Sequence, residues 1–244
     1  MKRVPVLAVP LLLAVACAHA PATSSAAGSI EILQPGGEEE AAQQVARVLP
    51  DALGRVERWG SLSAPVVVRI QPTGDALAAA AGRPGDTWLR GWARYGSVDL
   101  QSPRTWTRGR ASDAAVATLL SHELTHCLLF QRIGGDWARR DVPPWFEEGM
   151  ASFTAGEQHA RADAAALAPG SAGRPFDAGL AYGTADRAFR YLVARHGEDS
   201  VRGVLDGLAG GQGFAIAFRG ATGSTVADFE ESLRAHLRAA TAVR

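Results

Sequence analysis

The stretch LLSHELTHCLLF, residues 119–130, constrains the fold most, because it places polar side chains inside an apolar helical run. Ser112 is a typical N-cap before this run, and Gly134 ends the helical pattern after it. We therefore expect one helix over residues 112–133. The apolar stripe that should face the core consists of Val116, Leu120, Leu124, Cys127 and Leu128.

His122 and His126 lie four residues apart, so both imidazoles project from the same edge of this helix. Two imidazoles placed in this way can reach one metal ion. Glu123 points about 100° away from His122, nearer the apolar face, where it can reach water at the metal but is poorly placed as a ligand. This is the H-E-x-x-H pattern, in which the histidines hold zinc and the glutamate is the general base. The alternative, a pair of hydrogen-bonded core histidines, would leave a buried Glu123 without a basic partner, which is costly.

A catalytic zinc ion usually takes three protein ligands and leaves one position for water. The extended motif with a third histidine is excluded, because Leu129 and Arg132 stand where its glycine and histidine would be. The next candidate is PPWFEEGMASF, residues 143–153, in which Glu147 and Glu148 fall in the first turn of a second predicted helix. Adjacent helical residues point about 100° apart, so only one of these glutamates should face the metal.

HELTH at residues 122–126, followed by WFEEGMA at 145–151, resembles the two motifs of the gluzincin metallopeptidases. It is similar in particular to the compact bacterial peptidase-MA-like proteins, whose second motif reads W-x-x-E-G followed by a small residue. The resemblance implies three zinc ligands and a general base, which are His122, His126 and Glu148 for zinc and Glu123 for the base. Glu147 is then interpreted as an acid favoured by the helix dipole.

The resemblance also implies a donor for the oxyanion that develops during the reaction. Related gluzincins often use a tyrosine or histidine after the third ligand, and Tyr182 is the best-placed candidate by its order along the chain. His159 and His196 are alternatives. Ser152 and Thr125 are candidates for orienting the metal ligands from behind.

The chain of 244 residues is predicted to be α+β, and by resemblance zincin-like, with a metal site between two parts of one domain, residues 29–244. Residues 29–135 carry the strand patterns SIEIL and APVVVRI and a hairpin that turns near Gly96. They form a small N-terminal sheet layer with helices. Residues 136–244 form a mainly helical C-terminal half, with helices expected at 145–155, 180–196, 198–209 and 225–240.

In a zincin-like fold an edge strand lines the cleft, so that an extended peptide can add to it by backbone hydrogen bonds. SVDLQ, residues 97–101, is our candidate for that strand. An ordinary strand of a hairpin is the alternative interpretation of the same residues.

The first residues resemble an export signal, with a short basic start and an apolar stretch too short to span a membrane comfortably. AVAC, ending at Cys17, resembles a bacterial lipoprotein signal, whereas AHA, ending at Ala20, fits ordinary cleavage; we favour the former. Residues 1–17 are thus predicted to be a signal peptide and 18–28 a flexible tether. The protein is expected in the periplasm or anchored to the membrane of a bacterial envelope through a lipid on Cys17.

The formal net charge is zero, which argues against an electrostatic nucleic-acid partner. The predicted function is a zinc-dependent hydrolase that cleaves peptide bonds of peptide or protein substrates in the envelope. Two alternatives stay open: a non-catalytic envelope protein that retains the fold for binding, and a zinc amidase that acts on cell-wall material. Glu123 favours an enzyme, because a binding protein would have little reason to retain a general base.

Overall fold

The structure is a computed structural model that describes residues 23–24, 29–106, 110–135, 141–159, 161–162 and 178–242. The predicted signal peptide, with Cys17, lies outside the described residues, and so does most of the predicted tether. Within the described ranges, none of the helices combines the length and the apolar character that crossing a membrane requires.

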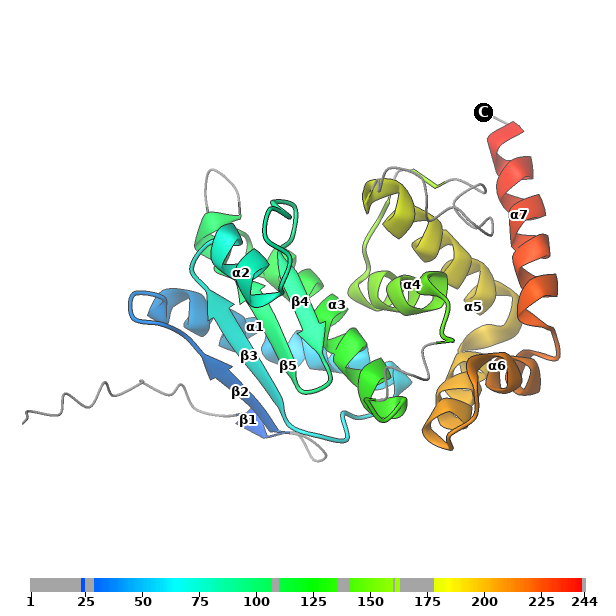
Figure 1. Cartoon of the computed structure of the whole chain (residues 1–244), viewed down its shortest axis with the longest axis horizontal. Helices are drawn as coiled ribbons and strands as arrows, with labels where there is room; N and C mark the ends of the chain where they lie inside the picture. Colours follow the sequence, from blue (N-terminus) through cyan, green and yellow to red (C-terminus); the bar gives the residue numbers. More distant parts are fainter. Residues whose placement is uncertain are drawn as a thin grey trace, which may run out of the picture.

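The chain has an α+β architecture, as predicted, with a sheet in its N-terminal part and helices in its C-terminal part (Figure 1). The strands lie in the order β1-β2-β3-β5-β4. Their bounds are Thr23–Ser24, Ser29–Leu33, Val66–Gln71, Gly91–Arg94 and Ser97–Gln101 for β1 to β5. β2, β3 and β5 are mutually parallel, whereas β1 and β4 pair antiparallel at the two ends of the sheet. The short β1 consists of two residues, Thr23 and Ser24, that fall within the predicted tether.

The hairpin predicted to turn near Gly96 is confirmed, because β4 and β5 pair from Arg94 and Ser97 onward. The prediction that SVDLQ is an edge strand is wrong, since β5 pairs with β3 on one side and with β4 on the other. Four of its five residues are buried, as expected for a strand flanked by neighbours. The strand at the end of the sheet is instead β4, Gly91–Arg94.

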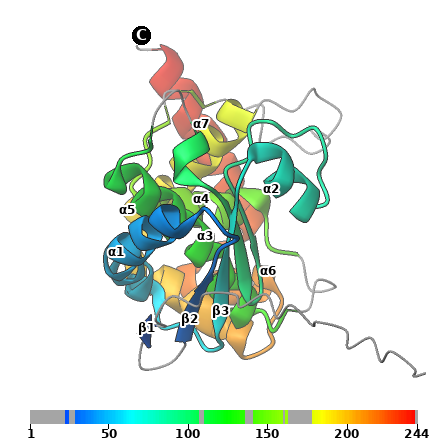
Figure 2. The same ribbon diagram turned by 90° about the vertical axis from the view of Figure 1, so that its left-hand side faces the viewer.

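The helices of the N-terminal part are α1, Glu39–Val56, α2, Gly74–Ala80, and α3, Asp113–Arg132, with short 3-10 turns at Glu57–Trp59 and Pro103–Thr105. α1 and α3 pack against each other and lie on one face of the sheet (Figures 1 and 2). Their apolar stripes meet the sheet in a continuous core that includes Leu49, Leu120 and Val68. The helix predicted over 112–133 is confirmed, and it runs through the centre of the molecule.

The C-terminal helices are α4, Pro144–Ala155, α5, Ala178–Ala209, α6, Phe214–Thr222, and α7, Val226–Ala242. α5 contains a break at Gly197 (φ 78°, ψ 167°), so the helices predicted at 180–196 and 198–209 lie end to end. α6 was not predicted, because its nine residues are too few to give a clear helical period. α4 joins this part to the rest by packing against both α3 and α5.

Candidate metal centre

The sequence around α3 determines where the helix begins and which residues it buries. The hydroxyl of Ser112 accepts a hydrogen bond from the backbone N–H of Ala115, 3.2 Å away, and so caps the N-terminus. The predicted apolar stripe is completely buried. The three polar side chains are nearly buried as well, with exposed fractions of 7% for His122, 6% for Glu123 and 7% for His126.

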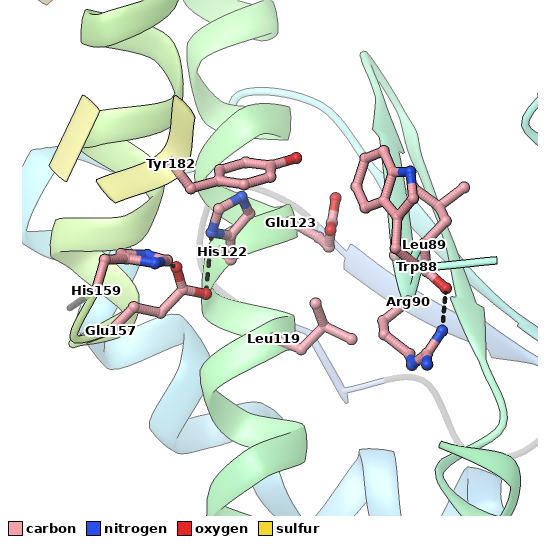
Figure 3. Close-up of a pocket in the computed structure, with 10 residues that line it drawn as sticks. Trp88, Leu89, Arg90, Leu119, His122, Glu123, Glu157, His159 and Tyr182 are labelled. Carbon is pink, nitrogen blue, oxygen red and sulfur yellow. Dashed lines mark hydrogen bonds and ion pairs between the residues drawn. The ribbon is translucent and has the colours of Figure 1, made fainter. Parts of the chain in front are cut away.

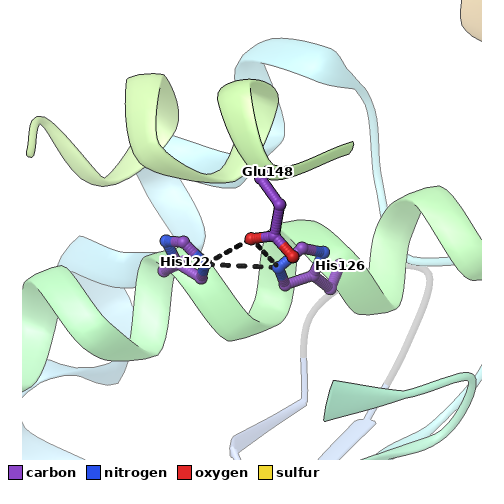
Figure 4. A group of neighbouring side chains, drawn as sticks. All are labelled: His122, His126 and Glu148. Carbon is purple, nitrogen blue, oxygen red and sulfur yellow. Dashed lines mark hydrogen bonds and ion pairs between the residues drawn. The ribbon is translucent and has the colours of Figure 1, made fainter. Parts of the chain in front are cut away.

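The two histidines and Glu148 converge from α3 and α4 (Figure 4). Nε2 of His122 lies 3.2 Å from Nε2 of His126. One carboxylate oxygen, Oε2 of Glu148, lies 3.5 Å from the first of these nitrogens and 3.4 Å from the second. The three potential ligand atoms all fall within 4.8 Å of one another, so this group can hold a metal ion.

The contacts among the three candidate ligands leave buried polar atoms unsatisfied, and a bound cation would satisfy them. Oε2 of Glu148 is buried without a hydrogen-bond partner among the described residues, and the two Nε2 atoms face each other. Buried polar groups left in this way are costly, and a cation between the three atoms would satisfy all of them.

The charges around the centre favour a positive ion. Burial opposes protonation of both histidines, but Glu148 and Glu157 raise the pKa of His122 well above its usual value. Glu148 likewise outweighs burial and raises the pKa of His126. Burial also works against ionisation of Glu148, yet the two histidines lower its pKa. The negative charge that favours protonated histidines at this position would also favour a dication.

Gly149 sets how closely α4, which carries Glu148, approaches α5. A Cβ at Gly149 would lie 2.3 Å from the carbonyl oxygen of Ala185, a distance that real Cβ atoms do not reach. Glycine therefore permits the close crossing of the two helices. The crossing fixes the depth at which α4 presents Glu148 to the histidines of α3.

The side chain of Glu123 lies between His122 and Trp88 (Figure 3), and its carboxylate reaches the edge strand β4 at Gly91. A Cβ at Gly91 would lie 2.3 Å from Oε1 of Glu123, so glycine leaves the space that this carboxylate occupies. Burial raises the pKa of Glu123, and the neighbouring Glu148 and Glu157 add to the effect while the two histidines oppose it.

Two adjoining cavities of about 200 Å³ and 330 Å³ lie between α3, β4 and Tyr182. We call them together the β4 cleft. Both cavities are lined by Trp88, Leu89, Gly91, His122, Glu123 and Tyr182. The smaller one extends toward Leu119 and the larger one toward His126 and Glu148. The candidate base therefore stands where the two cavities meet.

Comparisons with known proteins add no family to these observations. No family model matches this chain. A search of curated proteins finds no significant match either. Function is therefore inferred from the geometry of the β4 cleft.

Tyr182 lies in the β4 cleft beside His122 and Trp88. Its ring centroid is 6.1 Å from that of His122 and 6.3 Å from that of Trp88. Burial raises the pKa of Tyr182, and Glu148 and Glu123 raise it further, so the phenol keeps its proton. His159 stacks on Tyr182 and also lines the cleft. His196 packs against Phe229 and is not among the residues that line the cleft.

Two further glutamates lie near the candidate ligands, and the sequence did not predict this position for either of them. Glu157 lies 3.2 Å from Nδ1 of His122, and Glu147 lies 3.8 Å from Nδ1 of His126. Glu147 lies in the first turn of α4, where an acid is favoured by the helix dipole, and Glu157 was not predicted because it lies outside both motifs. Thr125, one of the two residues expected behind the ligands, instead donates to the carbonyl oxygen of Ser121 in its own helix.

Proposed function

We propose that this protein is a zinc-dependent peptidase of the gluzincin type. The observation that carries the proposal is the combination of a three-ligand group within 4.8 Å and a separate buried carboxylate in the same cleft. His122, His126 and Glu148 are the proposed ligands. Two imidazoles and one carboxylate are a donor set that catalytic zinc commonly uses.

Zinc bound by these residues would act as a Lewis acid toward the scissile carbonyl and would lower the pKa of water. Glu123 accepts the proton of the attacking water and then donates it to the nitrogen of the leaving amine. A raised pKa makes the carboxylate of Glu123 a stronger base toward the attacking water, and the protonated group is still acidic enough to protonate the much more basic amine. Tyr182 donates a hydrogen bond from its phenolic hydroxyl to the oxyanion.

The edge strand β4 supports a peptide as the substrate. The carbonyl oxygen of Arg90 accepts from the backbone N–H of Gln101, so by alternation Gly91 and Ala93 direct their N–H and C=O groups away from β5. In the described part of the chain no strand pairs with this side of β4. An extended substrate can add there, next to Glu123.

The proposal includes the envelope location inferred from residues 1–20, with peptide or protein substrates in that compartment. A non-catalytic binding protein and a zinc amidase for cell-wall material are the competing functions. The position of Glu123 in the cleft favours catalysis over binding alone. The open edge of β4 favours peptide bonds over other amides.

The test compares metal content and cleavage in the chain without residues 1–20. We expect one zinc ion per chain both in the unmodified protein and in Glu123→Gln. The unmodified protein should cleave members of a peptide library, whereas Glu123→Gln should not. Glu148→Ala should lose most of its zinc, and Tyr182→Phe should lower kcat with little change in KM. Glu57→Gln, at an exposed position, is the control. Failure of the unmodified protein to bind zinc when it is supplied would overturn the proposal.

A further inference from the structure

We propose that Glu157 is a positioning residue that holds the imidazole of His122 in place for the metal. The inference rests on the proposed metal site but concerns a residue outside the ligand set. Oε1 of Glu157 lies 3.2 Å from Nδ1 of His122, while Nε2 of the same ring faces Glu148 (Figures 3 and 4). Glu157 and the metal position are therefore on opposite sides of one imidazole.

This arrangement selects the form of His122 that can bind a metal. An imidazole binds through a nitrogen that carries no proton, and a carboxylate beside the other nitrogen keeps the proton there. Glu157 next to Nδ1 thus leaves the lone pair on Nε2. It also restricts rotation of the ring about its bond to Cβ.

The end of α4 brings Glu157 to this position. Gly156 adopts a left-handed conformation (φ 72°, ψ 25°), and the backbone N–H of Glu157 donates to the carbonyl oxygen of Ser152, 3.0 Å away. This bond closes a glycine-terminated helix end and turns the chain back toward α3. One helix therefore supplies Glu148 before its middle and delivers Glu157 directly after its end.

Contacts on several sides hold Glu157 in place. Nη2 of Arg190 donates to its backbone carbonyl oxygen, 2.9 Å away, and Nε2 of His159 lies 3.0 Å from its Oε2. Both carboxylate oxygens thus have a defined histidine neighbour, and the group is set before a metal binds.

Glu147 offers a matched comparison, because it stands in the same relation to the other histidine at a longer distance. Its Oε1 lies 3.8 Å from Nδ1 of His126, beyond hydrogen-bond range. If negative charge near the metal were all that mattered, removing either glutamate would weaken metal binding alike. If position matters, removing Glu157 should weaken it more.

The experiment measures the zinc dissociation constant by competition with a chromophoric chelator, using the chain without residues 1–20. Loss of a carboxylate that orients a ligand weakens metal binding about 10–100-fold, and we expect this for Glu157→Ala. Glu157→Gln should bind zinc more weakly than the unmodified protein but more tightly than Glu157→Ala, because its amide oxygen can face Nδ1 but carries no negative charge. Glu147→Ala should show a smaller loss, and Glu57→Ala none.

The outcomes separate this inference from the proposed function. Unchanged zinc affinity in Glu157→Ala, beside tight binding by the unmodified protein, would overturn the role of Glu157 and leave the peptidase proposal standing. An unmodified protein that binds no zinc would overturn both. If Glu157→Ala does not fold, the Gln variant decides: weaker zinc binding by the folded protein supports the inference, and unchanged binding refutes it.

Discussion

At the scale of single residues, the candidate site depends on glycines as much as on charged groups. Gly91 and Gly149 are not ligands, yet each leaves space that a methyl group would take from a functional element. Gly91 faces the carboxylate of Glu123, and Gly149 faces the backbone of α5. Gly91 thus controls the position of the Glu123 side chain, and Gly149 controls the distance between α4 and α5.

We expect Gly91→Ala to impair catalysis without loss of metal. The new Cβ would lie 2.3 Å from Oε1 and 2.6 Å from Cδ of Glu123, so the carboxylate would have to move. A displacement of about 1 Å at a catalytic group can lower the rate about 100-fold. The measurements are kcat/KM on a cleaved peptide and zinc content by elemental analysis.

Gly54→Ala serves as the control for this change, because nothing lies within 4 Å of a Cβ at that position. A Gly91→Ala protein with unaltered kcat/KM would show that Glu123 is not confined by β4.

At the scale of elements, α4 organises the site. Its first turn carries Glu147, the following residue is the proposed ligand Glu148, and the turn after its end carries Glu157. One anchor of the helix is Trp145, which stacks on Phe229 of α7 with ring centroids 5.0 Å apart. Its other anchor is the close crossing with α5 at Gly149. A shift of α4 would therefore move both carboxylates relative to α3.

We expect Gly149→Ala to reduce stability by about 1–3 kcal/mol, the usual cost of overpacking a tight contact. Its neighbour at 2.3 Å is backbone, the carbonyl oxygen of Ala185, which cannot rotate away. Zinc affinity should fall as well, because α4 would be pushed along or away from α5. Urea denaturation with chelator present measures the stability, and chelator competition measures the affinity.

A matched change is Gly220→Ala in α6, where a Cβ would meet nothing within 4 Å. Equal stability of the Gly149→Ala and Gly220→Ala proteins would contradict the role assigned to the α4–α5 crossing.

At the scale of the whole molecule, the candidate metal centre joins the two parts of the chain. His122 and His126 come from α3, which packs on the sheet, and Glu148 comes from α4, which packs on the C-terminal helices. A metal ion held by all three would thus link the parts in addition to their apolar contacts. A ligand that binds only the folded state stabilises it in proportion to the logarithm of its concentration over Kd.

Removal of zinc should therefore lower the melting temperature. At a free zinc concentration about 100 times Kd, the lost stabilisation is about 2.7 kcal/mol. Thermal unfolding followed by circular dichroism, with and without chelator, gives the difference. Glu148→Ala should melt at the same temperature in both conditions. If the unmodified protein melts at the same temperature with zinc and with chelator, the result would contradict a metal site shared by the two parts of the chain.

Much of the site could be predicted from local sequence. The cap at Ser112 and the glycines after Arg132 define α3 almost to the residue, and the helical period puts His122 and His126 on one side. The burial of Glu123 followed from the same period. The third ligand came from the resemblance of the second motif, since spacing alone left Glu147 and Glu148 as alternatives.

The sequence by itself determined the α+β class, the central helix and the direction of its polar side chains, because caps and periodicity act over a few neighbouring residues. Only the tertiary structure decided that β4 rather than β5 is the edge strand, since strand order depends on pairing between distant segments. It also decided that Glu157 meets His122, because the turn at Gly156 has this effect only once α4 lies across α3. Local backbone preferences are encoded in short stretches, whereas contacts between elements follow from how all of them pack into one core.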